Sequence, residues 1–232
     1  MRHDWRRVND RDRSSPREEE DDGAPPAHTR LIGRAITGLV ARAPWTWSVL
    51  RGPVTRFFSE RAEGWDERTG AGGVDHLAAL ASAALLVKPH PERVLDLGTG
   101  TGEAALFLAR EFPRARVRGV DVSEQMVRLA QSKVGLDPEG RIAFRVADAG
   151  QLPFDEDSFD LVAQVNVPVF FGEAARVLRP GGSVIVVSSI GARTPFHTPA
   201  PVLRRGFARH GIREVENGTT GNGTWFVGRR PG

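Results

Sequence analysis

Acidic and glycine residues at the ends of apolar runs are the residues of this sequence best suited to chemistry. Asp96 ends an apolar run and is followed by glycine at three alternate positions, Gly98, Gly100 and Gly102. Glycine lets the chain bend sharply and leaves no Cβ between backbone and ligand, so backbone N–H groups can approach a nucleotide-like molecule. An ordinary glycine-rich turn is the alternative interpretation.

Two further carboxylates occupy equivalent places along the chain. Asp121 ends a second apolar run and can accept hydrogen bonds from both hydroxyls of a ribose. Asp148 ends a third run and can accept from an exocyclic amine such as that of adenine. Val122 and Leu152 offer apolar surfaces to a purine ring. Each acid has the alternative role of a strand-end cap, but the three together favour a nucleoside site.

The elements that must position these acids alternate between strand and helix patterns. Strands are predicted over residues 94–97, 117–121, 142–147, 159–163, 183–188, 212–215 and 224–227. Helices are predicted over residues 103–112, 123–132, 172–178 and 201–210, with Ser123 as an N-cap. This alternation predicts a Rossmann-like α/β fold with a doubly wound, mostly parallel sheet of about seven strands. Ligands of such sheets bind at the carboxyl ends of the strands, where the strand order reverses.

Three regions are predicted. Residues 1–28 are polar and lack an apolar period, which indicates a disordered tail or, alternatively, an interaction arm. Residues 29–90 form a helical layer, and residues 91–232 form the ligand-binding core. In the layer, an amphipathic helix is predicted from the apolar positions Leu31, Ile32, Ala35, Ile36, Leu39 and Val40. Pro44 and the pair Gly52-Pro53 are predicted to break the layer into short pieces, and 74–87 to form a further helix.

The helical layer has three possible roles. It can pack over one end of the core, and it can in addition act as a lid that forms part of a substrate pocket. Contact with a membrane surface through Trp45 and Trp47 is a third interpretation. The polar face of the layer does not favour it, because that face is not strongly basic.

Composition excludes several classes of protein. The chain of 232 residues has no cysteine, so disulfides and thiolate metal sites are excluded, and no metal site is predicted. The net charge is only +3, so the chain gives no strong nucleic-acid signal. No apolar run reaches the length of a transmembrane helix, and the charged N-terminus does not resemble a signal peptide. We therefore expect a cytoplasmic protein.

The glycine turn differs from those of dinucleotide and phosphate sites. Glu103 occupies the position of the final glycine of a dinucleotide fingerprint, and the Lys-Ser/Thr pair of a phosphate-binding loop is missing. The carboxylate of Asp96 beside the turn favours a ligand with positive charge. S-adenosylmethionine, which carries an ammonium and a sulfonium, has that character.

Five segments together carry a family resemblance: 94–102, 119–123, 147–154, 158–162 and 175–182. In these segments the sequence resembles the class I S-adenosylmethionine-dependent methyltransferase family, in particular members that act on small molecules. The resemblance implies that Asp96 and the loop residues Gly98, Thr99, Gly100 and Gly102 hold the methionine end of the cofactor. It implies that Asp121 contacts the ribose, next to Val122, and that Asp148 and Ala149 contact adenine. The segment around Phe57, Phe58 and Trp65 looks like the part that covers the cofactor.

The implied reaction is transfer of a methyl group to a small-molecule acceptor, with the protein positioning the acceptor nucleophile in line with the sulfonium methyl. No residue must be a general base, and His76, Glu60 and His197 are candidates by location. The connection after residue 163 is shorter than is usual in the family, so we expect residues 29–90 and 191–201 to line the acceptor pocket. Asn166 in this connection can face the cofactor. A methyltransferase acting on RNA or protein, and a non-catalytic cofactor-binding protein, are the alternatives; the oligomeric state is left open.

Overall fold

The computed structural model describes residues 25–232 and contains one seven-stranded sheet. The strands are β1 (Arg93–Leu97), β2 (Arg116–Asp121), β3 (Ile142–Val146), β4 (Phe159–Val165), β5 (Leu178–Ser188), β6 (Arg213–Thr220) and β7 (Gly223–Arg229). Their order is β3-β2-β1-β4-β5-β7-β6. The neighbours from β3 to β5 are parallel, whereas β7 is antiparallel to both β5 and β6. The sheet is therefore mixed, because a C-terminal hairpin closes it, and the order reverses between β1 and β4.

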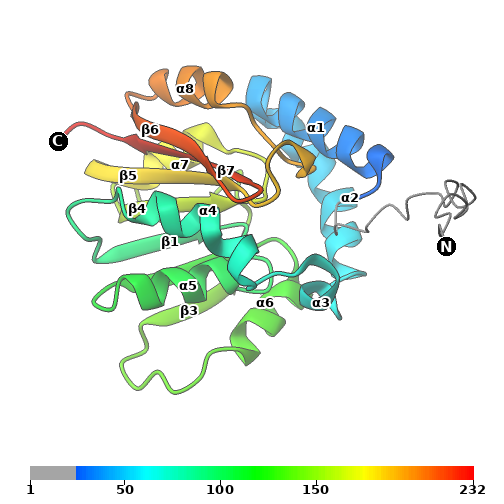
Figure 1. Ribbon diagram of the computed structural model, residues 1–232, viewed down its shortest axis with the longest axis horizontal. Coiled ribbons are helices and arrows are strands. Elements are labelled where there is room, and N and C mark those ends of the chain that lie inside the picture. Colours follow the sequence, from blue (N-terminus) through cyan, green and yellow to red (C-terminus); the bar gives the residue numbers. More distant parts are fainter. Residues whose placement is uncertain (1–24) are drawn as a thin grey trace, which may run out of the picture.

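Helices cover both faces of this sheet (Figure 1). They are α4 (Val74–Ala84), α5 (Glu103–Glu111) and α6 (Glu124–Ser132) on one face, and α7 (Phe171–Val177) and α8 (Ala200–Ala208) on the other. Side chains of each strand alternate between the two cores: Leu95 and Leu97 pack with α7 and α8, while Val94 packs with α4 and α5. Strands buried on both faces explain the continuous apolar runs of the sequence.

The N-terminal layer consists of α1 (Ala27–Arg42), the 3-10 helix η1 (Pro44–Thr46), α2 (Trp47–Ser59), α3 (Trp65–Thr69) and α4. In Figure 1, α1 and α2 lie at the outer side of the molecule, and α3 lies near α6. The predicted polar tail falls almost entirely outside the described residues. Its last two residues, Ala27 and His28, belong to α1, so the tail was predicted to extend too far.

One prediction for this layer is wrong, and another is right only in part. Gly52-Pro53 does not end a helix, because Pro53 lies inside α2. The carbonyl that loses its partner to proline belongs to Val49, an exposed residue, so water can satisfy it. The amphipathic helix predicted here is present as α1, and Val40 and Ile36 pack on the core as the pattern suggests. The rest of the core-facing side is formed by Gly33 and Thr37, whereas Leu31, Ile32 and Leu39 face solvent.

Among the described residues, no helix is long and apolar enough to cross a membrane.

Candidate functional site

The turn after β1 has the backbone conformation that glycine favours. Gly98, Gly100 and Gly102 have φ values of 75°, 53° and 87°, in the left-handed region. The amides of Gly98 and Thr99 donate to the carbonyl of Val120, at 2.9 and 2.8 Å, and fix the turn against β2. A Cβ at Gly98 would lie 2.4 Å from a methyl of Val167, but one at Gly100 would meet nothing within 4 Å. The turn is therefore packed at its base and open at Gly100.

Asp96 is buried at the base of this turn. The Thr99 hydroxyl donates to Asp96 Oδ2 at 2.6 Å, while Asp96 Oδ1 is buried without a hydrogen-bond partner in the described chain. Burial raises the pKa of Asp96 to about 6, and the charge of Asp121 adds to this rise. Hydrogen bonds from Thr99 and the Ala105 amide oppose it. A half-satisfied buried carboxylate favours a cationic or hydrogen-donating ligand beside it.

Asp121 connects the turn to the end of β2. Its two carboxylate oxygens accept from the amide of Gly100 at 2.9 Å and from the amide of Ser123 at 2.8 Å. Burial is the largest influence on the carboxyl and raises the pKa of Asp121, although these amides oppose the rise. Each oxygen has a second lone pair, so the carboxylate retains the capacity to accept two hydroxyl groups. Val122 follows it, half-buried.

Asp148, at the end of β3, is held by the N-terminal layer. Trp47 Nε1 donates to its Oδ1 at 2.6 Å, and Arg51 Nη1 forms an ion pair with its Oδ2 at 2.6 Å. The amide of Gly150 also donates to Oδ1, at 2.8 Å. A carboxylate accepts about four hydrogen bonds, so about one acceptor position is left for an amine. The neighbouring Ala149 is buried in the core beneath α2.

The same layer contacts the turns after β1 and β2. Thr101 Oγ1 donates to Asp66 Oδ1 of α3 at 2.5 Å, and Lys133 links the carboxylates of Asp66 and Glu103. Ser59, the last residue of α2, lies 2.8 Å from the hydroxyl of Ser123, the N-cap of α6. Polar contacts between residues far apart in sequence thus fasten α2 and α3 to the core.

The fourth tip, after β4, contacts α4. Asn166 has a left-handed φ of 56°, its side chain pairs with Ser189 in both directions at 2.8 Å, and its Nδ2 lies 3.3 Å from His76 Nε2. Burial lowers the pKa of His76, while the charges of Glu103 and Asp66 oppose this effect. His76 is consequently neutral at pH 7 and able to accept a proton.

The other two candidate bases lie elsewhere. His197 Nδ1 lies 3.2 Å from the Ser188 hydroxyl at the end of β5, and its pKa is lowered by burial and by Arg34. Glu60 is exposed and pairs with Arg56 and Arg61 on the surface of the layer. The side chain of Glu60, the residue after α2, is therefore turned outward, away from the predicted site.

Aromatic rings from both predicted pocket walls come together. The ring of Phe58 lies 5.3 Å from that of Trp65 and 6.1 Å from that of Phe196, which belongs to the segment 191–201. The N-terminal layer and this segment therefore meet, as expected from the short connection after β4.

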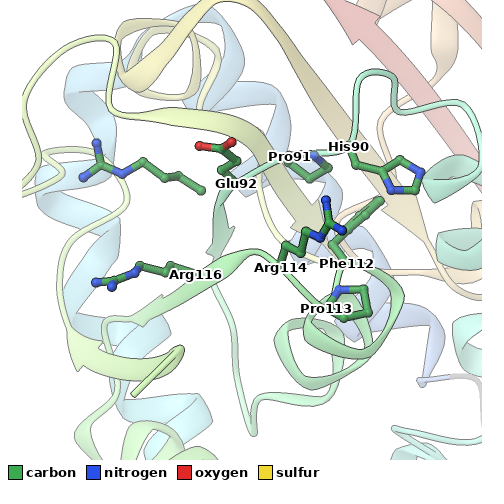
Figure 2. A pocket seen from close by; sticks show the side chains of 8 residues that line it. His90, Pro91, Glu92, Phe112, Pro113, Arg114 and Arg116 are labelled. Carbon is green, nitrogen blue, oxygen red and sulfur yellow. The ribbon is translucent and has the colours of Figure 1, made fainter. Parts of the chain in front are cut away.

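A cleft of about 670 Å³ lies at the amino ends of β1 and β2, opposite the predicted site (Figure 2). It is lined by Arg93 and Arg116, the first residues of β1 and β2, and by the turns before those strands. Ligands of parallel sheets bind at the carboxyl ends, so this cleft is not the predicted site. In the described residues, no cluster of histidine and acidic side chains could hold a metal ion, and the sequence predicts none.

Sequence reasoning missed several residues of this arrangement. They are Trp47, Ser59, Asp66, Thr101, Glu103, Lys133 and Ser189 as partners of the predicted ones, together with Arg51. The spacing of Trp47 and Arg51, four apart on one helix, indicates that they share a target. No local signal identifies that target as Asp148, which lies about one hundred residues away.

Comparison with known proteins shows which family this arrangement resembles. Residues 94–182 match the sequence pattern of a family described as "Methyltransferase domain". The chain is 34% identical over 152 residues to a demethylmenaquinone methyltransferase of Roseiflexus castenholzii, covering 62% of this chain and 63% of the relative. It is 36% identical over 150 residues to a ubiquinone/menaquinone biosynthesis C-methyltransferase, UbiE, of Syntrophotalea carbinolica, covering 62% and 60%. The matched part of the chain is a methyltransferase domain of the class I S-adenosylmethionine-dependent type.

The solved structures agree at the level of fold. A SAM-dependent methyltransferase from Thermotoga maritima superposes with a TM-score of 0.57 at 18% identity, covering 75% of this chain and 99% of that one. The match of residues 94–182 to a methyltransferase domain, and the likeness in fold to a methyltransferase solved with S-adenosylmethionine, confirm the predicted cofactor. The alignments span about three fifths of the length of the curated relatives.

Proposed function

We propose that this protein transfers the methyl group of S-adenosylmethionine to a small-molecule acceptor. The observation that carries the proposal is that the N-terminal layer contacts all four strand tips of the predicted cofactor site: Thr101, Ser123, Asp148 and Asn166. Such a cover would restrict access to these strand ends, which would suit a small acceptor and the exclusion of water. The predicted cytoplasmic location stays a prediction.

The residues at the tips fit the cofactor. The partnerless Oδ1 of Asp96 suits the ammonium group, and the open side of Gly100 leaves room for the ligand beside the backbone. Asp121 would accept the ribose hydroxyls with its remaining lone pairs, and Asp148 would accept the adenine amine with its last one. Val122 would flank the ring, and Trp65 would cover the methionine side.

This chain's residues would then act by position. When bound, S-adenosylmethionine supplies a methyl group already activated by the sulfonium. The aromatic cluster of Phe58, Trp65 and Phe196 would orient a flat acceptor. His76, neutral at pH 7, would accept the acceptor's proton at Nε2 in place of the hydrogen bond from Asn166 Nδ2, where the acceptor is protonated. The remote contacts of the layer would hold these groups in place.

A quinone-type ring is the acceptor class to test first. The relatives above are named for menaquinone and ubiquinone biosynthesis, and the aromatic cluster offers rings to stack on. The experiment incubates the full chain with methyl-labelled S-adenosylmethionine and either a demethylated menaquinone or a small-molecule extract, followed by mass spectrometry. Label in a small molecule supports the proposal. Label only in protein or RNA would select the second interpretation, and binding without transfer would select the third.

A further inference from the structure

Large apolar side chains are exposed together on the N-terminal layer. In the described part of the chain, half of the large exposed apolar side chains fall within residues 31–57: Leu31, Ile32, Leu39, Trp45, Val49 and Phe57. Trp45 is 74% exposed and Val49 71%. Scattered exposed apolar residues are ordinary, but a concentration on consecutive elements marks an interaction surface.

These side chains follow the outward face of α1. Leu31, Ala35 and Leu39 are four residues apart and form one exposed stripe, with Ile32 beside it. The opposite face of α1 packs against the rest of the protein, since Gly33 lies directly against Pro195 and Val40 is buried in the core. The stripe therefore has no partner within the described chain.

The next elements continue this pattern. In η1 and α2, Trp45 and Val49 are exposed four residues apart, whereas Trp47 and Val54 are buried. Figure 1 shows α1 and α2 joined along the outer side of the molecule. We call the exposed apolar residues Leu31, Ile32, Leu39, Trp45 and Val49 the docking face.

The charge around the docking face has one sign. Residues 27–59 contain no aspartate or glutamate and five arginines. Arg51 and Arg56 form ion pairs with Asp148 and Glu60, so the positive charge of the face comes from the arginines of α1, which are Arg30, Arg34 and Arg42. Exposed arginines such as Arg34 and Arg42 lie on the same helix as the stripe. An apolar face that carries tryptophan, with arginines on the same helix, is typical of helices that lie in the interface of an anionic bilayer.

We propose that the docking face binds the surface of a bilayer that contains anionic phospholipid. The earlier interpretation, a membrane contact through Trp45 and Trp47, is thereby changed. Trp47 is buried and donates a hydrogen bond to Asp148, whereas Trp45 and the stripe of α1 would contact the bilayer. The segment is also more basic than its polar face suggested, because it lacks acids altogether. This proposal does not depend on the identity of the acceptor.

The test is flotation of the full chain with vesicles of phosphatidylcholine alone or mixed with phosphatidylglycerol. We expect binding to the mixed vesicles at low salt, loss of binding on phosphatidylcholine alone, and a several-fold decrease as the salt concentration rises. The double variant Leu31→Gln/Leu39→Gln should bind at least about tenfold more weakly, since two apolar side chains leave the lipid.

A matched control is the double variant Leu85→Gln/Leu136→Gln, which changes two leucines outside the docking face that are at least as exposed as Leu31 and Leu39, and it should bind like the original protein. Phosphatidylglycerol with brominated acyl chains should quench tryptophan emission, and Trp45→Phe should abolish most of that quenching. Circular dichroism establishes that the variants are folded.

Three outcomes would overturn the proposal. One is the absence of flotation with phosphatidylglycerol at low salt, as expected if another segment of the chain covers the face. Another is equal loss of binding in both double variants. The last is a dimer in sedimentation that Leu31→Gln/Leu39→Gln dissociates without any vesicle binding, which would assign the docking face to a second copy.

Discussion

Arg51 Nη1 lies 2.6 Å from Asp148 Oδ2 and joins α2 to the end of β3. On the same helix, one turn earlier, Trp47 donates to the other oxygen of that carboxylate. Asp148, the predicted adenine-binding acid, therefore also binds α2 of the N-terminal layer through Arg51 and Trp47. Cofactor binding and the position of the layer are coupled through one side chain.

The energy of the Arg51–Asp148 pair can be measured by a double-mutant cycle with Arg51→Met and Asp148→Asn. Arg51 is about half exposed, so we expect a coupling of roughly 0.5–1 kcal/mol in the free energy of unfolding by urea. Additive effects of the two changes would show that the ion pair contributes nothing. The surface pair Arg128–Glu124, treated in the same way, provides a comparison for an ion pair within one helix.

Asp121→Asn should weaken cofactor binding by about 10- to 100-fold, because a hydrogen bond to a charged group contributes about 1.5–3 kcal/mol. Isothermal calorimetry measures the affinity. A cofactor analogue lacking a ribose hydroxyl separates the ribose contact from the effect on the Gly100 and Ser123 amides. The original protein should lose affinity for this analogue, and the Asp121→Asn variant should not distinguish the two ligands.

The glycine turn permits a comparison of strain with packing. Gly100→Ala should cost about 1–2 kcal/mol of stability, because only the left-handed φ opposes the methyl group. Gly98→Ala should cost about 1–3 kcal/mol more, since its Cβ also meets Val167. Adding Val167→Ala to Gly98→Ala should recover the stability lost through the clash with Val167, but not the stability lost through the left-handed φ. Equal costs at Gly98 and Gly100 in urea unfolding would contradict this account.

The buried carboxyl of Asp96 should make cofactor binding depend on pH. Its pKa in the fold is raised to about 6, so the carboxylate that suits a cation is lost as the pH falls through 6. With half of the carboxyl ionised near pH 6, affinity at pH 5 should be about tenfold weaker than at pH 7. Asp96→Asn should remove most of this dependence. Calorimetry of both proteins across this range tests the prediction.

In the absence of ligand, the sign of this linkage is reversed. A pKa raised above the unfolded value means that the folded state binds the proton more tightly, so ionisation of Asp96 destabilises the fold as the pH rises from about 4 to 6. A rise of the pKa from 3.8 to about 6 corresponds to about 3 kcal/mol. Cofactor should therefore raise the melting temperature more at pH 7 than at pH 5.

His76→Ala should lower the rate of methyl transfer by about 10²–10⁴-fold for an acceptor that must lose a proton. The pKa of His76 is lowered by burial, so the original rate should fall only below about pH 6.5, on the acid limb of the profile. Glu60→Gln is the matched control, because Glu60 lies exposed beside Arg56 and Arg61 and should leave the rate unchanged. The rates are measured at saturating cofactor, so that the titration of Asp96 does not contribute, and an acid limb that persists in the alanine variant under these conditions would rule out His76 as the base.

The sequence by itself determined the core of this protein. Apolar runs buried on both faces define the strands, and the alternation with helices defines a sheet whose carboxyl ends carry Asp96, Asp121 and Asp148. The glycine turn is a local feature too, because left-handed φ values at Gly98 and Gly100 demand glycine wherever the turn lies. The cofactor class follows from these short segments.

Only the tertiary structure decided how the N-terminal layer is used. The periodicity of α1 fits a helix that packs through Leu31 and Leu39 as well as one that packs through Gly33 and Val40, and docking against Pro195 selects the second. The partners Arg51 and Asp148 lie about one hundred residues apart, so no local pattern joins them. Contacts between distant segments depend on where the whole chain places its helices, and that placement is a property of the packed fold.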